Sequence, residues 1–257
     1  MKNGNNSIEY VDASGKRRDG RTVDETRPIK IKVGVVERSN GSALVEWGAN
    51  KAIAAVYGPR EVIPRHKANP YKAIVRFYYR MAPFSVPEHK NPRPGRREIE
   101  ISKVCSEALE RAVLTHKFPN SQIDVYVTIL DSDAGTRITA LTAASVALAA
   151  AGIPMKDLVA GVAVGRAGGK IIVDLNKEEE DAPDAVDLPV AFLPALDEVV
   201  LLQQDGPMTP GEWKEALELG KKASLKVYEL QRNALREAYE APKDSGPRDA
   251  GYVGEVQ

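Results

Sequence analysis

The chain is poor in the residues that build disulfide-linked or metal-held scaffolds. Its 257 residues include one cysteine, Cys105, and three histidines, none of them at a short metal-ligand spacing. We interpret the cysteine, at an apolar position of a predicted helix, as a small buried hydrophobic residue, neither a disulfide partner nor a nucleophile. The histidine spacing predicts no zinc site. With 43% hydrophobic residues, the chain has ample material for a core.

Long hydrophobic runs are also missing. The sequence contains no run of about 18 apolar residues, the length that a membrane-spanning helix needs. Its first 20 residues are polar and lack the apolar core of a signal peptide. We therefore expect a cytoplasmic protein with no membrane partner.

A net charge is absent as well, since 36 Lys and Arg balance 36 Asp and Glu. The charges are nevertheless segregated along the chain. Residues 60–97 hold ten Lys or Arg against two acids, and residues 174–187 hold seven acids against one lysine. The first segment suits a polyanion and the second a cation. Aromatic residues within residues 71–97 could stack on the bases of single-stranded RNA, although such residues more often belong to a core.

Hydrophobic periodicity predicts an α+β chain of two consecutive halves, each of strands followed by a helix. We expect a flexible segment at residues 1–16, a first half at 17–152, a second half at 153–241 and a flexible tail at 242–257. The expected strands are residues 29–35, 43–47, 51–57, 71–81, 123–130, 158–164, 170–174, 188–192 and 198–204. The expected helices are residues 98–116, about 136–152 and 210–239.

The turn before the second predicted helix is the best candidate for an anion site. Gly135, Thr136 and Arg137 lead directly into an Ala-rich segment that reads as a buried helix. Free backbone N–H groups and the helix dipole favour an anion at such a start. The Thr136 hydroxyl and the Arg137 fork suit a phosphate. An ordinary N-cap threonine beside a solvated arginine remains open.

Two further groups of charged residues flank this candidate in the sequence. Arg96 and Arg97 lie in or just before the first turn of a predicted helix, where positive charge is unfavourable unless an anion compensates it. Asp181 and Asp187 lie six residues apart, and a carboxylate pair at a phosphoryl centre commonly holds Mg²⁺ or supplies an acid. Each group could equally be solvated surface, but their combination predicts phosphoryl transfer on RNA.

The sequence also resembles a known family over about residues 8–241. The resemblance rests on RRDGR (17–21), GPREVIPRH (58–66), MAPFS (81–85), GRREIEISK (95–103), DAGTR (133–137), PMKDLVAGVAVG (154–165) and EEEDAPDAVDLPVAF (178–192). These motifs resemble the RNase PH family, and within it the catalytic RNase PH-like subunit of the archaeal exosome. The resemblance implies an RNase PH fold, ribosomal protein S5 domain 2-like, with two related halves of small sheets packed with helices.

The resemblance further implies an activity and roles for individual residues. The implied enzyme is a phosphorolytic 3′→5′ exoribonuclease that uses inorganic phosphate as co-substrate and releases nucleoside diphosphates. Five groups of residues match the family's motifs: Gly135, Thr136 and Arg137 as phosphate binders, Arg96 and Arg97 at the RNA's terminal phosphates, Arg65 and His66 at RNA further upstream, Asp181 as the favoured general acid, and Asp181 with Asp187 as contacts for Mg²⁺ or Mn²⁺.

The implied partners are single-stranded RNA and other protein subunits. Three copies would alternate with three copies of a non-catalytic sister in a six-membered ring, with S1/KH-type cap subunits on one face. The acidic pair, which the sister lacks, marks this chain as the active partner. Two alternatives stay open: a homohexameric RNase PH that trims tRNA 3′ ends, and a non-catalytic RNA-binding ring scaffold.

Overall fold

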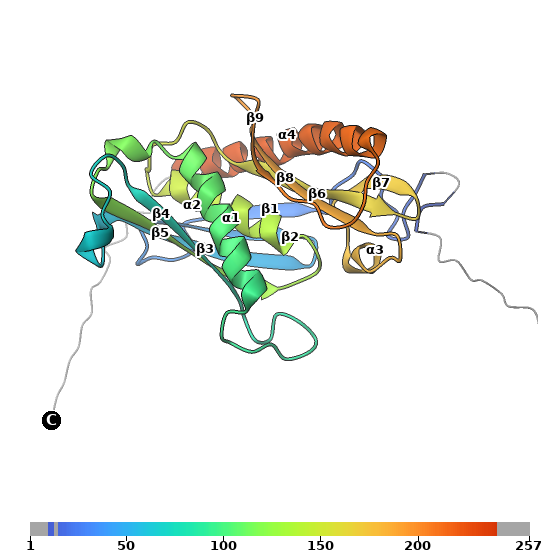
Figure 1. Ribbon diagram of the computed structural model, residues 1–257, viewed down its shortest axis with the longest axis horizontal. Helices are drawn as coiled ribbons and strands as arrows, with labels where there is room; N and C mark the ends of the chain where they lie inside the picture. The colour runs from blue at the N-terminus through green and yellow to red at the C-terminus, as the bar shows by residue number, and fades with distance from the viewer. Residues whose placement is uncertain (1–9, 13–14, 241–257) are drawn as a thin grey trace, which may run out of the picture.

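The computed structural model describes residues 10–12 and 15–240. These residues form two β-sheets and four α-helices, which confirms the predicted α+β class (Figure 1). Within them, no helix is long and apolar enough to cross a membrane. The predicted tail at residues 242–257 lies outside the described residues.

The first sheet has five strands in the order β1-β2-β3-β5-β4. Strands β1 (Ile29–Val33), β2 (Gly41–Trp47) and β3 (Asn50–Glu61) form the predicted antiparallel meander. Strand β5 (Ser121–Asp131) pairs antiparallel with β3, and β4 (Ile74–Met81) lies parallel to β5 at the edge. Alternate residues along these strands are buried, which is the period-2 pattern of a sheet with one covered face.

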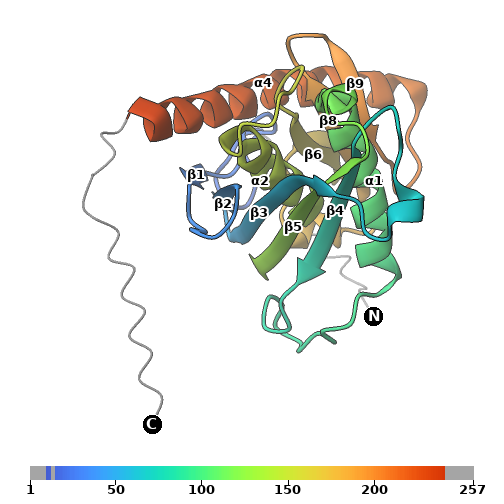
Figure 2. The same cartoon turned by 90° about the vertical axis from the view of Figure 1, so that its left-hand side faces the viewer.

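Helices α1 (Arg96–Ala112) and α2 (Thr136–Ala150) cover the buried face of the first sheet. Figure 2 shows α1 beside the edge strand β4. Two serines of α1 satisfy that edge: the backbone N–H of Phe77 donates to Ser106 Oγ at 2.8 Å, and that of Tyr79 donates to Ser102 Oγ at 3.0 Å. Helix α2 is apolar on nearly every side because it lies between the first sheet and the second.

The second sheet has the order β7-β6-β8-β9. Its strands are β6 (Ala160–Ala167), β7 (Lys170–Val173), β8 (Val186–Leu193) and β9 (Glu198–Leu202), and all neighbours are antiparallel. Small residues of β6 and β8 pack into the core that contains α2, whereas valines of the same strands pack against α4 (Pro210–Glu240). The two sheets therefore share helices, and the cleft described below forms where they meet.

Two predicted boundaries were wrong for physical reasons. The helix expected at residues 98–116 ends at Ala112, because Val113 pairs with Met155 and residues Thr115–Lys117 form a separate 3-10 turn. The acidic segment at residues 174–187, where no helix was expected, contains a short helix, α3 (Lys177–Glu180). Asn176 and Glu179 form a capping box there, with the Glu179 N–H donating to Asn176 Oδ1 at 3.0 Å and the Asn176 N–H to Glu179 Oε2 at 2.9 Å.

The N-terminal segment also differs from the expectation of a loose end at residues 1–16. Tyr10 and Val11, two of its described residues, are buried against apolar side chains of the second sheet and its α3 loop. Residues 17–27, predicted to belong to the first half, make their main side-chain hydrogen bonds with residues 173–179 of the second. The start of the chain is therefore packed across both halves.

Candidate active site

The predicted site residues meet in a cleft of about 480 Å³ between the two sheets. Residues from α1, α2, α3, β8 and the loop after β9 line it. The charged and amide side chains in its wall are Arg97, Glu100, Arg137, Glu180, Asp187, Gln203, Gln204 and Asp205. Three predicted residues from distant parts of the sequence, Arg97, Arg137 and Asp187, thus share one cleft.

The turn before α2 has the backbone that an anion-binding helix start requires. Ala134 and Gly135 both have left-handed φ angles, +49° and +67°, and Gly135 is the N-cap. The Gly135 carbonyl accepts hydrogen bonds from the N–H groups of Ile138 and Thr139. Such a backbone favours glycine, and without a side-chain cap the first N–H groups of α2 remain available to a ligand.

Thr136 and Arg137 have different surroundings within this turn. Thr136 is buried, and its Oγ1 accepts a hydrogen bond of 2.9 Å from the Tyr79 hydroxyl. Burial raises the pKa of Tyr79 to about 12, so its O–H remains a donor. Of the described turn, only Arg137 reaches the cleft wall. The sequence predicted a direct role for the Thr136 hydroxyl, whereas in the structure Tyr79 already occupies one of its acceptor positions.

Arg137 is mostly buried yet poorly satisfied. Its side chain is 16% exposed, and its Nη2 lies 3.7 Å from Glu100 Oε2, beyond hydrogen-bond distance. Its Nε is buried without a hydrogen-bond partner among the described residues. A buried guanidinium with unused donors is costly unless an anion pairs with it. The charge and the unused N–H groups of Arg137 therefore suit an anion in the cleft.

The two arginines at the start of α1 separate in the structure. Arg97 lines the cleft, whereas Arg96 is exposed and lies outside its wall. Glu98 supplies a compensating negative charge in the first turn, and its Oε2 accepts the Gly95 N–H at 2.8 Å. This capping contact stabilises the start of α1 without the arginines. The Arg97 side chain is therefore available to a ligand in the cleft.

The two predicted aspartates also separate in the structure, because only Asp187 lies in the wall of the cleft. Asp187 lines the cleft, and burial raises its pKa to about 6, with the charges of Glu180 and Asp205 acting in the same direction. The nearby Arg137 and Arg97 oppose this rise. Asp181, the predicted general acid, is instead exposed outside the cleft wall, with Lys177 Nζ at 2.7 Å from its Oδ1. Asp187 is thus the carboxyl whose environment suits a proton donor near neutral pH.

The acidic residues of the cleft suit a magnesium ion that takes only one or two of its ligands from the protein. No group of three or more carboxylate, histidine or cysteine side chains is close enough for a metal cage within residues 10–12 and 15–240. Mg²⁺, however, commonly binds through one or two carboxylates and takes waters and substrate phosphate oxygens as its other ligands. Asp187, beside Glu180 and Asp205, fits that arrangement, and Asp181 would have to leave Lys177 to join it.

The residues predicted to touch RNA further upstream lie apart from the cleft. Arg65 and His66 belong to a 3-10 turn, η1 (Arg65–Lys67), between β3 and β4, and none of its residues is buried. The Arg65 side chain is 84% exposed and its Nε lies 2.6 Å from Glu61 Oε1. Both side chains are therefore accessible, as a contact with a passing strand requires, but they share no wall with Asp187.

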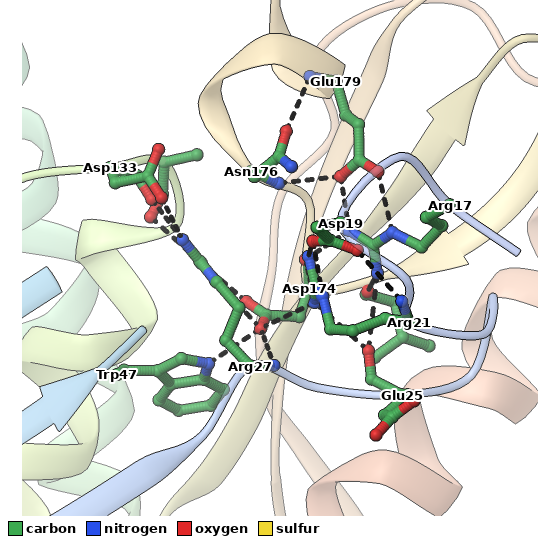
Figure 3. A network of polar contacts seen from close by, with 12 residues as sticks. Arg17, Asp19, Arg21, Glu25, Arg27, Trp47, Asp133, Asp174, Asn176 and Glu179 are labelled. Carbon is green, nitrogen blue, oxygen red and sulfur yellow. Dashed lines mark hydrogen bonds and ion pairs between the residues drawn. The ribbon is translucent and has the colours of Figure 1, made fainter. Parts of the chain in front are cut away.

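Sequence reasoning missed a buried polar network behind the turn (Figure 3). Asp174 accepts hydrogen bonds from Arg27 and from Trp47 Nε1, the latter at 2.9 Å. Burial works to raise the pKa of Asp174, but the hydrogen bonds and charge of Arg27 outweigh it and lower that pKa. Arg17 binds Glu179 in the same network. The four arginines in residues 17–27 were the only local signal, since the main partners of Arg17 and Arg27 lie far along the chain.

Comparison with known proteins identifies the fold. The model of the 3′ exoribonuclease family, domain 1, matches residues 25–154, and that of domain 2 matches residues 157–223. Exosome complex component Rrp41 of Thermococcus kodakarensis is 54% identical over 232 residues, covering 90% of this chain and 93% of that protein. Its counterpart in Methanopyrus kandleri is 53% identical over 229 residues, covering 89% and 95%.

Solved structures agree with this assignment. The crystal structure of rice Rrp46 has a TM-score of 0.78 and 26% identity, covering 86% of this chain and 100% of that one. A chain of the Archaeoglobus fulgidus exosome with RNA bound to the active site has a TM-score of 0.72 and 24% identity, covering 84% and 92%, and shows a shared fold. The predicted RNase PH fold is confirmed, and the chain belongs to the RNase PH family of 3′ exoribonucleases.

Proposed function

We propose that this chain is the catalytic subunit of an archaeal-type exosome and degrades RNA from the 3′ end by phosphorolysis. The observation that carries the proposal is the meeting of Arg97, Arg137 and Asp187 in one cleft. This arrangement offers two cations for phosphate groups and one carboxyl with a raised pKa for a leaving oxygen. Relatives that are more than half identical carry the name of an exosome component, which supports the same assignment.

In the proposed reaction, inorganic phosphate is bound at the start of α2 by its N–H groups and by Arg137. A phosphate oxygen attacks the phosphorus of the terminal phosphodiester and forms a new P–O bond, while the bond to the 3′-oxygen of the preceding nucleotide breaks. The Asp187 carboxyl donates its proton to that leaving oxygen. The products are a nucleoside 5′-diphosphate and an RNA one nucleotide shorter, and the reverse reaction adds nucleotides.

Charge stabilisation and positioning account for catalysis in this scheme. The nucleophile is itself a bound anion, so no activated serine or cysteine is required. Arg97 neutralises the terminal phosphate of the RNA, and Arg137 neutralises the attacking phosphate. Mg²⁺ or Mn²⁺ would be held by Asp181 and by the Asp187 oxygen that does not carry the proton, and would supply additional neutralisation of phosphate charge.

Partners complete the proposal. Single-stranded RNA reaches the cleft past Arg65, His66 and Arg96, whose exposed positions suit contact with a moving strand. A non-catalytic RNase PH-like sister subunit alternates with this chain in a 3+3 ring, and S1/KH-type cap subunits bind one face of that ring. We place the assembly in the cytoplasm.

The test is release of nucleoside diphosphates from a short single-stranded RNA by the chain assembled with its sister subunit. We expect release that depends on added phosphate, disappears in Asp187→Ala and proceeds from the 3′ end. Phosphate-independent release, or none from the assembled ring, would contradict phosphorolysis. Measuring the mass of the chain alone and of its mixture with the sister tests the assembly, because a self-sufficient active homohexamer contradicts the exosome assignment.

A further inference from the structure

We propose that Arg27 and Asp174 are positioning residues for the phosphate-binding turn at residues 133–137. Neither side chain lines the cleft, so neither touches a bound phosphate or RNA. They act by fixing the backbone that presents the N–H groups of α2 and the Arg137 side chain. This inference rests on the proposed phosphorolytic function and adds to it the part of the protein that holds the nucleophile's site in place.

The turn requires external support because of its conformation. Ala134 has a φ of +49°, which costs free energy for a residue with a side chain, and Gly135 follows it at +67°. A backbone of this kind persists only when its surroundings over-determine it. The carbonyl groups of Asp133 and Ala134 precede α2 and accept their hydrogen bonds from side chains distant in the sequence.

Arg27 supplies those donors as a fork. Its Nη1 donates to the Asp133 carbonyl and to Asp133 Oδ2, the second at 3.0 Å, and its Nη2 donates to the Ala134 carbonyl at 3.4 Å. Asn50 also stabilises the backbone of the turn, since its Nδ2 donates to the Ala134 carbonyl and its Oδ1 accepts the Asp133 N–H. Figure 3 shows the Arg27 side chain extended between Asp133 and Asp174. One guanidinium thus fixes two successive peptide groups of the turn.

Asp174 in turn fixes the direction of Arg27. Its Oδ2 accepts the Arg27 backbone N–H at 2.6 Å and Nε at 3.0 Å, and its Oδ1 accepts Nη2 at 2.7 Å. Trp47 donates to the same carboxylate from β2. The Arg27 side chain is 7% exposed and that of Asp174 2%, so water competes little for these bonds. The phosphate turn is thereby attached to the end of β7 in the second sheet.

The same network has a second arm that leads to the acidic segment. Arg17 donates from Nε to Glu179 Oε1 at 2.7 Å and from Nη1 to the Val173 carbonyl at 2.7 Å. Glu179 completes the capping box of α3, the helix that precedes Asp187. The Arg27 arm holds the carbonyl groups of the turn directly. The Arg17 arm holds α3 and reaches the turn only indirectly, through the Asp174 carbonyl and through the Lys177 N–H that donates to Asp133 Oδ1. Because both arginines are buried and paired, they form a matched pair for mutagenesis.

The experiment compares Arg27→Lys with Arg17→Lys in the full chain assembled with its sister subunit. Lysine keeps the positive charge but cannot span two carbonyl groups and a carboxylate with a planar fork. We expect Arg27→Lys to raise the KM for phosphate by about ten- to hundredfold, because small misplacements of a bound reactant are costly. Its KM for RNA should change less than about twofold, since Arg97 lies on α1, outside this network. Arg17→Lys should leave the KM for phosphate within about twofold.

Hydrogen exchange and melting temperatures separate positioning from general destabilisation. We expect faster amide exchange at residues 135–139 in Arg27→Lys and not in Arg17→Lys, at comparable losses of melting temperature. Equal effects of both variants on the KM values for phosphate and RNA would overturn the inference. So would an unchanged KM for phosphate in Arg27→Lys.

A second variant covers the case in which Arg27→Lys fails to fold. Asp174→Asn keeps the shape of the side chain, and asparagine tolerates the left-handed φ of +57° at this position. We expect the same selective rise in the KM for phosphate, and its absence would again overturn the inference. Failure of the proposed function looks different, because the unmutated assembly would then show no phosphate-dependent release at all.

Discussion

The turn that we propose binds phosphate and the arginines that we propose contact RNA are built in opposite ways. The turn is partly buried, its backbone is held by Arg27 and Asn50, and its Thr136 hydroxyl accepts a hydrogen bond from Tyr79. Arg65 and Arg96 are exposed, and Arg65 pairs only with a surface glutamate. The backbone of the turn is therefore held in one conformation, whereas the exposed arginine side chains can change theirs.

This difference matches the two substrates of the proposed reaction. Inorganic phosphate is small and must approach the phosphorus from one direction, which favours a preorganised backbone and a buried arginine. RNA must advance by one nucleotide after each cleavage, so its contacts have to form and break repeatedly. Exposed arginines on surface turns can follow a moving phosphate chain without rearranging the core. The following predictions test this comparison, from the largest expected effect to the smallest.

The largest effect is expected where the two parts meet, at Asp187. Asp187→Asn should lower kcat by about 10²–10⁴-fold, the usual contribution of a general acid. The measurement is release of nucleoside diphosphates at saturating phosphate and RNA. An amide cannot donate the proton that the leaving 3′-oxygen requires. A kcat within tenfold of that of the unmutated assembly would contradict the role of Asp187 as the general acid.

The same substitution should stabilise the fold near neutral pH. Burial raises the folded-state pKa of Asp187 from 3.8 to about 6, so ionising it disfavours folding. This cost is absent below about pH 4, grows as the pH rises and is complete above about pH 6. Discounted for partial exposure, Asp187→Asn should gain roughly 1–2 kcal/mol in the free energy of unfolding at about pH 7.5 and little at pH 4. Asp181→Asn is the control, because its exposed carboxyl should change stability little.

Arg137→Ala should separate the two substrates. We expect the KM for phosphate to rise about ten- to hundredfold, because two charge-assisted hydrogen bonds to the nucleophile are lost. Arg96→Ala, at the exposed side of the site, should instead weaken RNA binding and leave the phosphate requirement nearly unchanged. Steady-state kinetics with phosphate and RNA varied in turn would show which substrate each variant affects. A phosphate requirement unchanged in Arg137→Ala would contradict the phosphate role of the turn.

Tyr79→Phe should show how much the hydrogen bond to Thr136 contributes to the stability of the fold. The change removes the hydroxyl that donates to the buried Thr136 Oγ1, at an expected cost of about 1–2 kcal/mol in the free energy of unfolding. Denaturant unfolding measures this cost. Tyr78→Phe, on the opposite face of β4, keeps the ring that stacks on Tyr126 at 4.7 Å and should cost less than about 0.5 kcal/mol. Equal costs would show that the Thr136 contact contributes nothing.

The smallest effect on the fold is expected at Arg65. Arg65→Ala should change the free energy of unfolding by less than about 0.5 kcal/mol, because the side chain is 84% exposed. RNA affinity should fall, and the slope of its logarithm against the logarithm of salt concentration should decrease by about 1. Titrations of labelled single-stranded RNA at several salt concentrations provide the measurement. An unchanged slope would place Arg65 away from the RNA path.

The elements of the fold could be predicted from the sequence where periodicity was strong. The antiparallel meander and the buried helix α2 each carry a local pattern that tertiary packing preserved. Helix α1 ended earlier than expected because Val113 pairs with Met155. This contact joins distant residues, so the local sequence pattern could not predict it. Short α3 was missed because its four residues are all charged and show no apolar stripe.

The site was predictable only in part for a similar reason. Gly135 and Arg137 stand out locally, because glycine before an Ala-rich run marks a helix start. The five residues between Asp181 and Asp187 form the turn after α3 and the start of β8, so spacing alone could not show that one carboxyl lines the cleft and the other pairs with Lys177. Arg27 and Asp174 are 147 positions apart, which places their pairing beyond any local pattern.

The serines that bind the edge of β4 have a consequence for association. An open strand edge with free N–H groups can recruit a strand from another chain and seed aggregation. Here Ser102 and Ser106 of α1 occupy the outward N–H groups of Tyr79 and Phe77, and the Thr115 carbonyl occupies that of Ala73. This edge therefore has no donors to offer at these positions. Strand pairing through this stretch of β4 is therefore disfavoured, which limits unspecific association of the chain through this edge.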